Sequence, residues 1–261
     1  MKYALLIGIN YKNTTNELNG CINDVMNMKN ILINKFGFLD KDIIILTEES
    51  VLKPTAKNII TQLTKIVLKA SSFPSSQLWI HYSGHGASIK DRNSDETDGF
   101  DEVIVPLDFN TNGFITDDKL HNILKYLPIR TKCICFFDCC HSGTILDLKY
   151  KYKTDCKEVI DNTRSRIKSN ICMISGCKDC QTSADFYNQL NGDWAGAMTT
   201  ALINSLEESN YDVSCYNLLN NMKIYLNKGK FLQIPQMTSS IHINTNTMFC
   251  SDYKNALIQT T

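Results

Sequence analysis

The sequence predicts an α/β fold in which a mostly parallel β-sheet is covered by helices on both faces. Short apolar runs rich in β-forming residues alternate along the 261-residue chain with longer segments whose apolar residues recur at helical spacing. Several runs, such as residues 133–137, are continuously apolar, as in strands that are buried on both faces. Strands that alternate with helices pair in parallel, because each helix carries the chain back across the sheet.

The first part of the chain predicts three strands separated by two helices. The expected strands cover residues 3–9, 42–46 and 77–82, and the expected helices cover residues 21–36 and 55–70. Gly37 follows the first helix, as is common at helix C-termini. Pro54 and Thr55 mark the start of the second helix.

The second part of the chain continues the alternation around one polar interruption. The expected elements are an extended segment at 102–106, a helix at 117–126 capped by Thr116, strands at 133–137 and 171–175, helices at 195–206 and 215–226, and a last strand at 240–243. Residues 148–168 are polar, basic and poor in core periodicity, which indicates a mobile surface connection. We expect one domain over residues 1–261, with this connection between a first half (1–147) and a second half (169–261).

Composition excludes several classes of protein. Basic and acidic residues are equal in number, 27 each, so no global charge favours binding to nucleic acid or to an anionic membrane. No apolar stretch approaches the roughly 20 residues needed to cross a bilayer, and the N-terminal segment resembles a buried strand more than a signal peptide. Eleven cysteines cannot all pair within one chain, so we expect a reducing, cytoplasmic location with mostly free thiols.

Two glycine-punctuated motifs carry the chemistry. YSGHG at residues 82–86 and DCCHSG at residues 138–143 each follow an apolar strand. In a parallel sheet both turns project from one edge, so His85 could face one of the two cysteines. A cysteine needs a nearby base to become a thiolate, and histidine is the natural partner. The alternative is a strand-terminating histidine with two small core cysteines, but two such motifs in one chain favour a site.

These motifs resemble the catalytic motifs of metacaspases, the caspase-like cysteine peptidases. The resemblance extends in order along nearly the whole chain, through ALLIGINY (4–11), GCINDV (20–25), VPLDF (105–109), TDD (116–118), SGCKDCQTSAD (175–185) and GAMTTAL (196–202). It implies a caspase-like fold whose large-subunit-like and small-subunit-like halves meet at the basic connection. The short connection is similar to the type I arrangement, and we expect no prodomain and a monomer.

The resemblance also assigns catalytic roles. In the family pattern the nucleophile directly precedes His-Ser-Gly, which is Cys140 here, while Cys139 fills a variable position. His85 is then the general base and acid of a dyad. The backbone N–H groups of Gly86 and Cys140 are, by analogy, the oxyanion donors.

The family's primary specificity pocket matches four residues of this chain. Its acids correspond to Asp24 and Asp138, and Cys21 and Ser83 line it. Two carboxylates in one pocket select arginine or lysine, because a cationic side chain offsets their burial and mutual repulsion. Taken alone, Asp24 also fits an exposed helix residue, whereas an acid such as Asp138 at the end of an apolar strand needs a partner.

Four further acids match the calcium ligands of calcium-dependent metacaspases. They are Asp101, Asp117, Asp118 and Asp147. Clustered carboxylates suit a hard, oxygen-preferring cation such as Ca²⁺. The alternative is that Asp117 and Asp118 are first-turn helix residues that interact favourably with the helix dipole.

Together these inferences predict a calcium-dependent cysteine endopeptidase that cleaves protein or peptide substrates after arginine or lysine. The connection contains basic residues that such an enzyme could cut in itself, namely Lys149, Lys151, Lys153, Lys157, Arg164, Arg166 and Lys168. They could equally be a solvated basic loop. The alternative functions are a caspase-fold scaffold without hydrolysis and a peptide ligase on the same fold.

Overall fold

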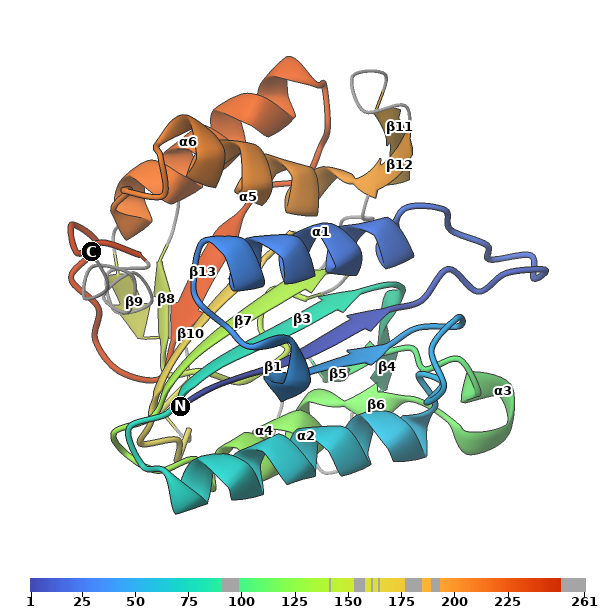
Figure 1. Ribbon diagram of the computed structural model, residues 1–261, viewed down its shortest axis with the longest axis horizontal. Helices are drawn as coiled ribbons and strands as arrows, with labels where there is room; N and C mark the ends of the chain where they lie inside the picture. The colour runs from blue at the N-terminus through green and yellow to red at the C-terminus, as the bar shows by residue number, and fades with distance from the viewer. Residues whose placement is uncertain are drawn as a thin grey trace.

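The computed structural model describes residues 1–90, 99–140, 142–152, 158–160, 162–163, 165–176, 185–188 and 193–249 (Figure 1). An eight-stranded sheet lies at its centre. Its strands are β1 (Lys2–Gly8), β2 (Ile43–Leu46), β3 (Gln77–Ser83), β7 (Lys132–Asp138), β8 (Tyr150–Tyr152), β9 (Glu158–Ile160), β10 (Asn170–Ser175) and β13 (Gln236–Ser239). The spatial order is β2-β1-β3-β7-β10-β13-β8-β9.

The sheet is parallel over its larger part. Strands β2, β1, β3, β7 and β10 pair in parallel, while β13, β8 and β9 are added antiparallel at one side. The register sets Ser83 opposite Asp138 and Phe137 opposite Ser175, so β3, β7 and β10 end together. The prediction of a mostly parallel sheet is therefore confirmed.

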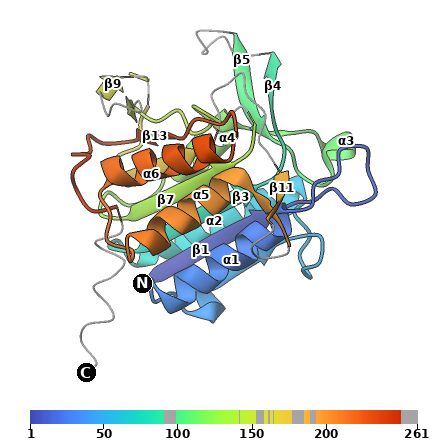
Figure 2. The same cartoon turned by 90° about the horizontal axis from the view of Figure 1, so that it is seen from above.

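Helices cover both faces of the sheet, as predicted (Figures 1 and 2). One face carries α1 (Cys21–Asn34), α5 (Ala197–Glu208) and α6 (Cys215–Lys228), and the other carries α2 (Ala56–Ser72) and α4 (Asp117–Leu124). Short helical turns occur at Asp40–Asp42 and in α3 (Phe109–Asn112). Each face has its own apolar core, because side chains alternate along the strands between the two helix layers.

The helix ends follow the residues that predicted them. The hydroxyl of Thr55 accepts the N–H of Asn58 at the start of α2, and the hydroxyl of Thr116 accepts the N–H of Lys119 at the start of α4. Gly37 has φ of +66° just after α1, a conformation that glycine adopts without strain.

Two smaller β-structures extend from the sheet. Strands β4 (Gly86–Lys90), β5 (Phe100–Ile104) and β6 (Ile115–Thr116) form an antiparallel sheet directly after β3, and β4 and β5 project from the body in Figure 2. Strands β11 (Asp185–Asn188) and β12 (Asp193–Gly196) form a ribbon that leads into α5. The β4 strand begins at Gly86, the last residue of the YSGHG motif, so this small sheet fixes the chain beyond His85.

Two expectations about the second half were wrong. The last strand covers Gln236–Ser239 rather than 240–243. It pairs with β10 and β8 inside the sheet, and all four of its residues are buried. The connection is not only a surface loop, since β8 and β9 join the edge of the sheet. Tyr152 anchors this edge, with its buried hydroxyl accepting the N–H of Ile243 at 2.7 Å.

Strands from both halves of the chain belong to the same sheet, because β7 pairs with β10 along six residues of each strand. Within the described ranges, no helix combines the length and apolar character needed to cross a membrane. The acidic residues 91–98 and the basic residues Lys153, Lys157 and Arg164 lie outside the described residues.

Candidate active site

The two motifs meet at the carboxyl edge of the sheet. Strands β3 and β7 are neighbours, and the N–H of Gly84 donates to the carbonyl of Asp138 at 3.3 Å. At Gly86, a Cβ atom would stand 2.0 Å from the carbonyl oxygen of Cys140. The turn that carries His85 therefore lies directly against the turn that carries Cys140, as the parallel sheet predicts.

The two adjacent cysteines have different surroundings. Cys139 is 0% exposed and packs in the apolar core beneath the edge. Cys140 is partly exposed, and the other six cysteines among the described residues are buried. Of the described thiols, Cys140 is thus the one that a substrate can reach without a change in the core.

The imidazole of His85 is held by a backbone carbonyl. Its Nε2 lies 2.7 Å from the carbonyl oxygen of Asn16, in the loop after β1. A carbonyl can only accept, so Nε2 carries the proton in the neutral ring and Nδ1 is left able to accept one. The contact with Asn16 could not be predicted from the sequence, because a backbone carbonyl has no side-chain signature.

Asp24 and Asp138 are both buried, at 1% and 2% exposed. Asp24 accepts the hydroxyl of Ser83 at 2.7 Å and the N–H of Gly196 at 2.9 Å. Asp138 accepts both the N–H and the hydroxyl of Thr199 at 2.9 Å. The interpretation of Asp24 as an exposed helix residue is therefore wrong.

The two carboxylates converge on one glycine. A Cβ atom at Gly196 would stand 2.3 Å from Oδ2 of Asp138 and 2.6 Å from Oδ2 of Asp24. Cys21, the first residue of α1, is also buried and lies one helical turn before Asp24. Gly196 and Thr199 were not singled out from the sequence, although both lie in the GAMTTAL segment that carries the family resemblance. The two buried carboxylates are thus close together beside the carboxyl end of β7.

Two of the four acids matched to calcium ligands open α4, on the sheet face opposite to α1. Asp101 is in β5, Asp117 and Asp118 open α4, and Asp147 has φ of +48° in the loop after β7. Asp117 is buried, and its two oxygens accept the N–H groups of Glu102 and Asp118, each at 2.7 Å. Part of its charge is thus stabilised by backbone donors.

The donor chemistry of this set suits calcium, since all four ligands would be carboxylates. Its arrangement does not yet form a metal centre. Among the described residues, no group of three or more His, Cys, Asp or Glu side chains is placed to hold a metal ion.

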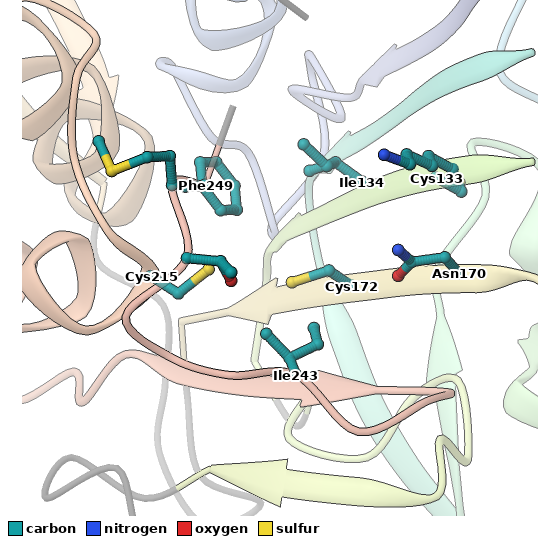
Figure 3. A pocket seen from close by; sticks show the side chains of 10 residues that line it. Cys133, Ile134, Asn170, Cys172, Cys215, Ile243 and Phe249 are labelled. Carbon is teal, nitrogen blue, oxygen red and sulfur yellow. The ribbon is translucent and has the colours of Figure 1, made fainter. Parts of the chain in front are cut away.

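A separate cavity of about 260 Å³ opens at the amino ends of the central strands (Figure 3). It lies where β7 and β10 begin, at Lys132 and Asn170, and Cys172 and Cys215 point into it. Because Cys140 follows the carboxyl end of β7, at the opposite end of that strand, this cavity is not part of the candidate catalytic site.

Comparison with known proteins agrees with this architecture. The family profile of the metacaspase peptidase C14 domain matches residues 2–149. Metacaspase-1 of Meyerozyma guilliermondii is 37% identical over 95% of this chain and 72% of the relative. Metacaspase-1 of Saccharomyces cerevisiae is 37% identical over 94% of this chain and 68% of the relative.

Solved structures show the same fold. A crystal structure of a Geobacter sulfurreducens protein superposes with a TM-score of 0.66 at 23% identity, covering 93% of this chain and 94% of the other. Caspase-1 of Spodoptera frugiperda superposes with a TM-score of 0.57 at 12% identity, covering 91% and 85%. The fold is caspase-like, and the chain belongs to the metacaspase family of C14 cysteine-type peptidases, which are hydrolases.

Proposed function

We propose that this peptidase is an endopeptidase that cleaves after arginine or lysine, with Cys140 as nucleophile and His85 as general base and acid. The observation that carries the proposal is the convergence of two buried carboxylates, Asp24 and Asp138, on Gly196 beside the catalytic edge. A guanidinium or ammonium group offsets the cost of burying two like charges. A carboxylate side chain would add to that cost.

The proposed reaction assigns each proton transfer to His85 and the nucleophilic attack to Cys140. His85 takes the thiol proton at Nδ1, and the Cys140 thiolate attacks the carbonyl carbon of the residue before the scissile bond. Backbone N–H groups of Gly86 and Cys140 stabilise the oxyanion. His85 returns the proton to the leaving amine as the C–N bond breaks, which leaves a thioester. Water then attacks the thioester and gives up a proton to His85. As the C–S bond breaks, His85 returns that proton to the Cys140 sulfur, and the carboxylic acid product leaves.

The carbonyl of Asn16 supports the histidine in both protonation states. It accepts the Nε2 proton at 2.7 Å whether the ring is neutral or cationic. This contact orients the ring so that Nδ1 is the nitrogen left to exchange a proton with Cys140. No side-chain carboxylate is needed for that role.

A panel of fluorogenic peptides ending in Arg, Lys or Asp tests the proposal. We expect hydrolysis of the Arg and Lys peptides, no hydrolysis of the Asp peptide, and no activity in Cys140→Ala. Cys139→Ala is the matched control and should retain activity, because Cys139 is buried below the site. Activity in Cys140→Ala would remove the nucleophile, and cleavage after Asp would overturn the pocket.

Two other functions on this fold give different results in the same assay. A scaffold would bind peptides without releasing product from any of them. A peptide ligase would form the same thioester but transfer the acyl group to an added amine in preference to water. Adding a nucleophilic amino acid amide and analysing the products by mass spectrometry separates ligation from hydrolysis.

We propose that calcium activates the enzyme through Asp101, Asp117, Asp118 and Asp147. When bound, calcium would order the loops beside the active site rather than take part in the chemistry. Isothermal titration of the inactive Cys140→Ala protein with CaCl₂ tests binding without activity or self-cleavage. We expect a binding isotherm that Asp117→Asn and Asp118→Asn weaken, while Asp40→Asn, on an exposed turn, leaves it unchanged. No binding heat in the parent protein would remove calcium from the proposal.

The proposed setting is cytoplasmic, and the proposed active species is a monomer that can nick its own connection. Sedimentation of the Cys140→Ala protein measures its oligomeric state. A stable dimer would contradict the monomer.

A further inference from the structure

Two buried tyrosine hydroxyls lie at the backbone of His85. The N–H of His85 donates to the hydroxyl of Tyr11 at 3.0 Å, and the hydroxyl of Tyr82 donates to the carbonyl of His85 at 2.7 Å. The two hydroxyls are 3.1 Å apart. Both polar groups of the His85 backbone are thus held by side chains from different parts of the chain, because Tyr11 lies in the loop after β1 and Tyr82 lies in β3.

The same hydroxyls reach one residue of the neighbouring segment. The hydroxyl of Tyr11 donates to the carbonyl of Val105 at 2.6 Å, and the N–H of Val105 donates to the hydroxyl of Tyr82 at 3.2 Å. The N–H of Val105 also donates to the carbonyl of His85 at 3.1 Å. The phenols therefore join the catalytic turn to the residue after β5.

The proton count of this network is consistent. Each phenol has one proton, so Tyr11 uses its proton on Val105 and accepts from His85, while Tyr82 uses its proton on His85 and accepts from Val105. Burial raises the pKa of both tyrosines above the ordinary value. Both phenols thus remain protonated donors throughout the pH range in which a cysteine peptidase works.

The chain accepts local strain to place these groups. Tyr11 has φ of +50°, which is uncommon for a bulky residue, and its ring lies 4.7 Å from the His85 imidazole. At Gly84, a Cβ atom would stand 2.8 Å from the hydroxyl of Tyr82 and 3.0 Å from that of Tyr11. A side chain at position 84 would therefore displace the hydroxyl pair.

We infer that Tyr11 and Tyr82 are positioning residues that fix the backbone of His85, so that its imidazole meets both Cys140 and the carbonyl of Asn16. The inference rests on the proposed role of His85 as base. An apolar ring would fill the same volume without holding the His85 peptide. The hydroxyls are therefore needed for alignment of the histidine rather than for packing alone.

The experiment compares Tyr11→Phe and Tyr82→Phe with the matched control Tyr152→Phe. Tyr152 is also buried and also accepts a backbone N–H, but it lies in β8, away from the catalytic turn. Two readouts are used on each protein: kcat and KM with an arginine peptide, and the pH dependence of Cys140 alkylation by iodoacetamide. Alkylation reports thiolate formation without requiring any substrate to be cleaved.

We expect kcat to fall about 10- to 100-fold in either tyrosine variant with KM within about twofold of the parent, because misalignment of a general base affects the chemical step. The alkylation profile should shift toward that of His85→Ala. Tyr152→Phe should lose stability to thermal unfolding but keep the parental kcat and alkylation profile.

Parental kcat and alkylation profiles in folded Tyr11→Phe or Tyr82→Phe would overturn the positioning role. If one variant does not fold, the other decides, since each holds a different group of the His85 backbone. A different result would contradict the proposed dyad itself, namely an unchanged alkylation profile of Cys140 in His85→Ala.

Discussion

Gly86 lies so close to Cys140 that the carbonyl oxygen of Cys140 occupies the space of a side chain at position 86, 2.0 Å from an ideal Cβ. The contact is between two backbones, so no rotation of a flexible side chain can relieve it. We therefore expect Gly86→Ala to reduce kcat/KM for an arginine peptide by at least about 100-fold through displacement of the Cys140 turn.

The exposed Ser88, two residues further along β4, provides the control for that substitution. Ser88→Ala should keep the parental kcat/KM and unfolding temperature. Parental activity in Gly86→Ala would contradict this prediction, because it would show that the turns at Gly86 and Cys140 can separate without a loss of activity.

The buried acid pair should determine specificity for the cationic side chain. Asp24→Asn and Asp138→Asn should each lower kcat/KM for arginine and lysine peptides by about 100-fold, because each removes one partner of a buried charge pair. The loss should appear mainly in KM, and Cys140 alkylation should remain parental. Asp193→Asn, exposed on the same strand as Gly196, should change neither value. Equal losses for an uncharged substrate would contradict a role in specificity.

His81 should make the stability of the fold depend on pH. It is fully buried against Phe136 and Thr199, and burial lowers its pKa from 6.5 to about 3. Below about pH 6.5 the imidazole of His81 binds a proton in the unfolded chain but stays neutral in the folded chain. The free energy of unfolding therefore falls by up to about 1.4 kcal/mol per pH unit as the pH decreases toward 3. Above pH 6.5 this loss is absent.

Urea unfolding at about pH 7.5 and about pH 5 measures the effect, with His81→Gln as the variant that cannot take up the proton. The parent should lose about 2 kcal/mol more than His81→Gln between the two conditions. Replacement of the exposed His242 by Gln should leave the parental difference intact. Equal losses in parent and His81→Gln would show that His81 is not the source.

Self-cleavage should favour basic residues that lie outside the strands of the connection. Arg166 and Lys168 are exposed and lie in no strand, whereas Lys151 lies in β8 between β9 and β13. A peptidase needs an extended, accessible segment, so the ladder hydrogen bonds protect the bond after Lys151. Mass spectrometry after calcium addition should show loss of cleavage near 166–168 in Arg166→Ala/Lys168→Ala and no change in Lys151→Ala. A main fragment ending at Lys151 would contradict this order.

The elements that the sequence predicted correctly are those whose own residues favour a strand or a helix. The continuous apolar runs of β1, β3 and β7 and the capping residues Thr55 and Thr116 depend on local chemistry. The strand Gln236–Ser239 does not, because its polar residues are buried only by neighbouring strands that are distant in the sequence. The predicted strand at 240–243 followed two isoleucines that lie just beyond the sheet.

The same division applies to the active site. His85 and Cys140 stand at the ends of apolar strands, which a parallel sheet brings to one edge. The burial of Asp24 depends on β12, and the contact with Asn16 depends on a loop carbonyl, so neither can be read from nearby residues. The role of Tyr11 needs the three-dimensional arrangement as well, because its hydroxyl, in the loop after β1, reaches the N–H of His85 only when β1 lies beside β3.

Asp24 and Asp138, the acids of the proposed pocket, belong to the first half of the chain, while the N–H groups that hold them, from Gly196 and Thr199, belong to the second half. The six-residue pairing of β7 with β10 crosses the same boundary. An enzyme nicked in the connection would therefore be a two-chain complex in which each chain completes the other's substrate pocket. Its unfolding midpoint would rise with protein concentration, unlike that of the intact chain, because dissociation becomes part of unfolding.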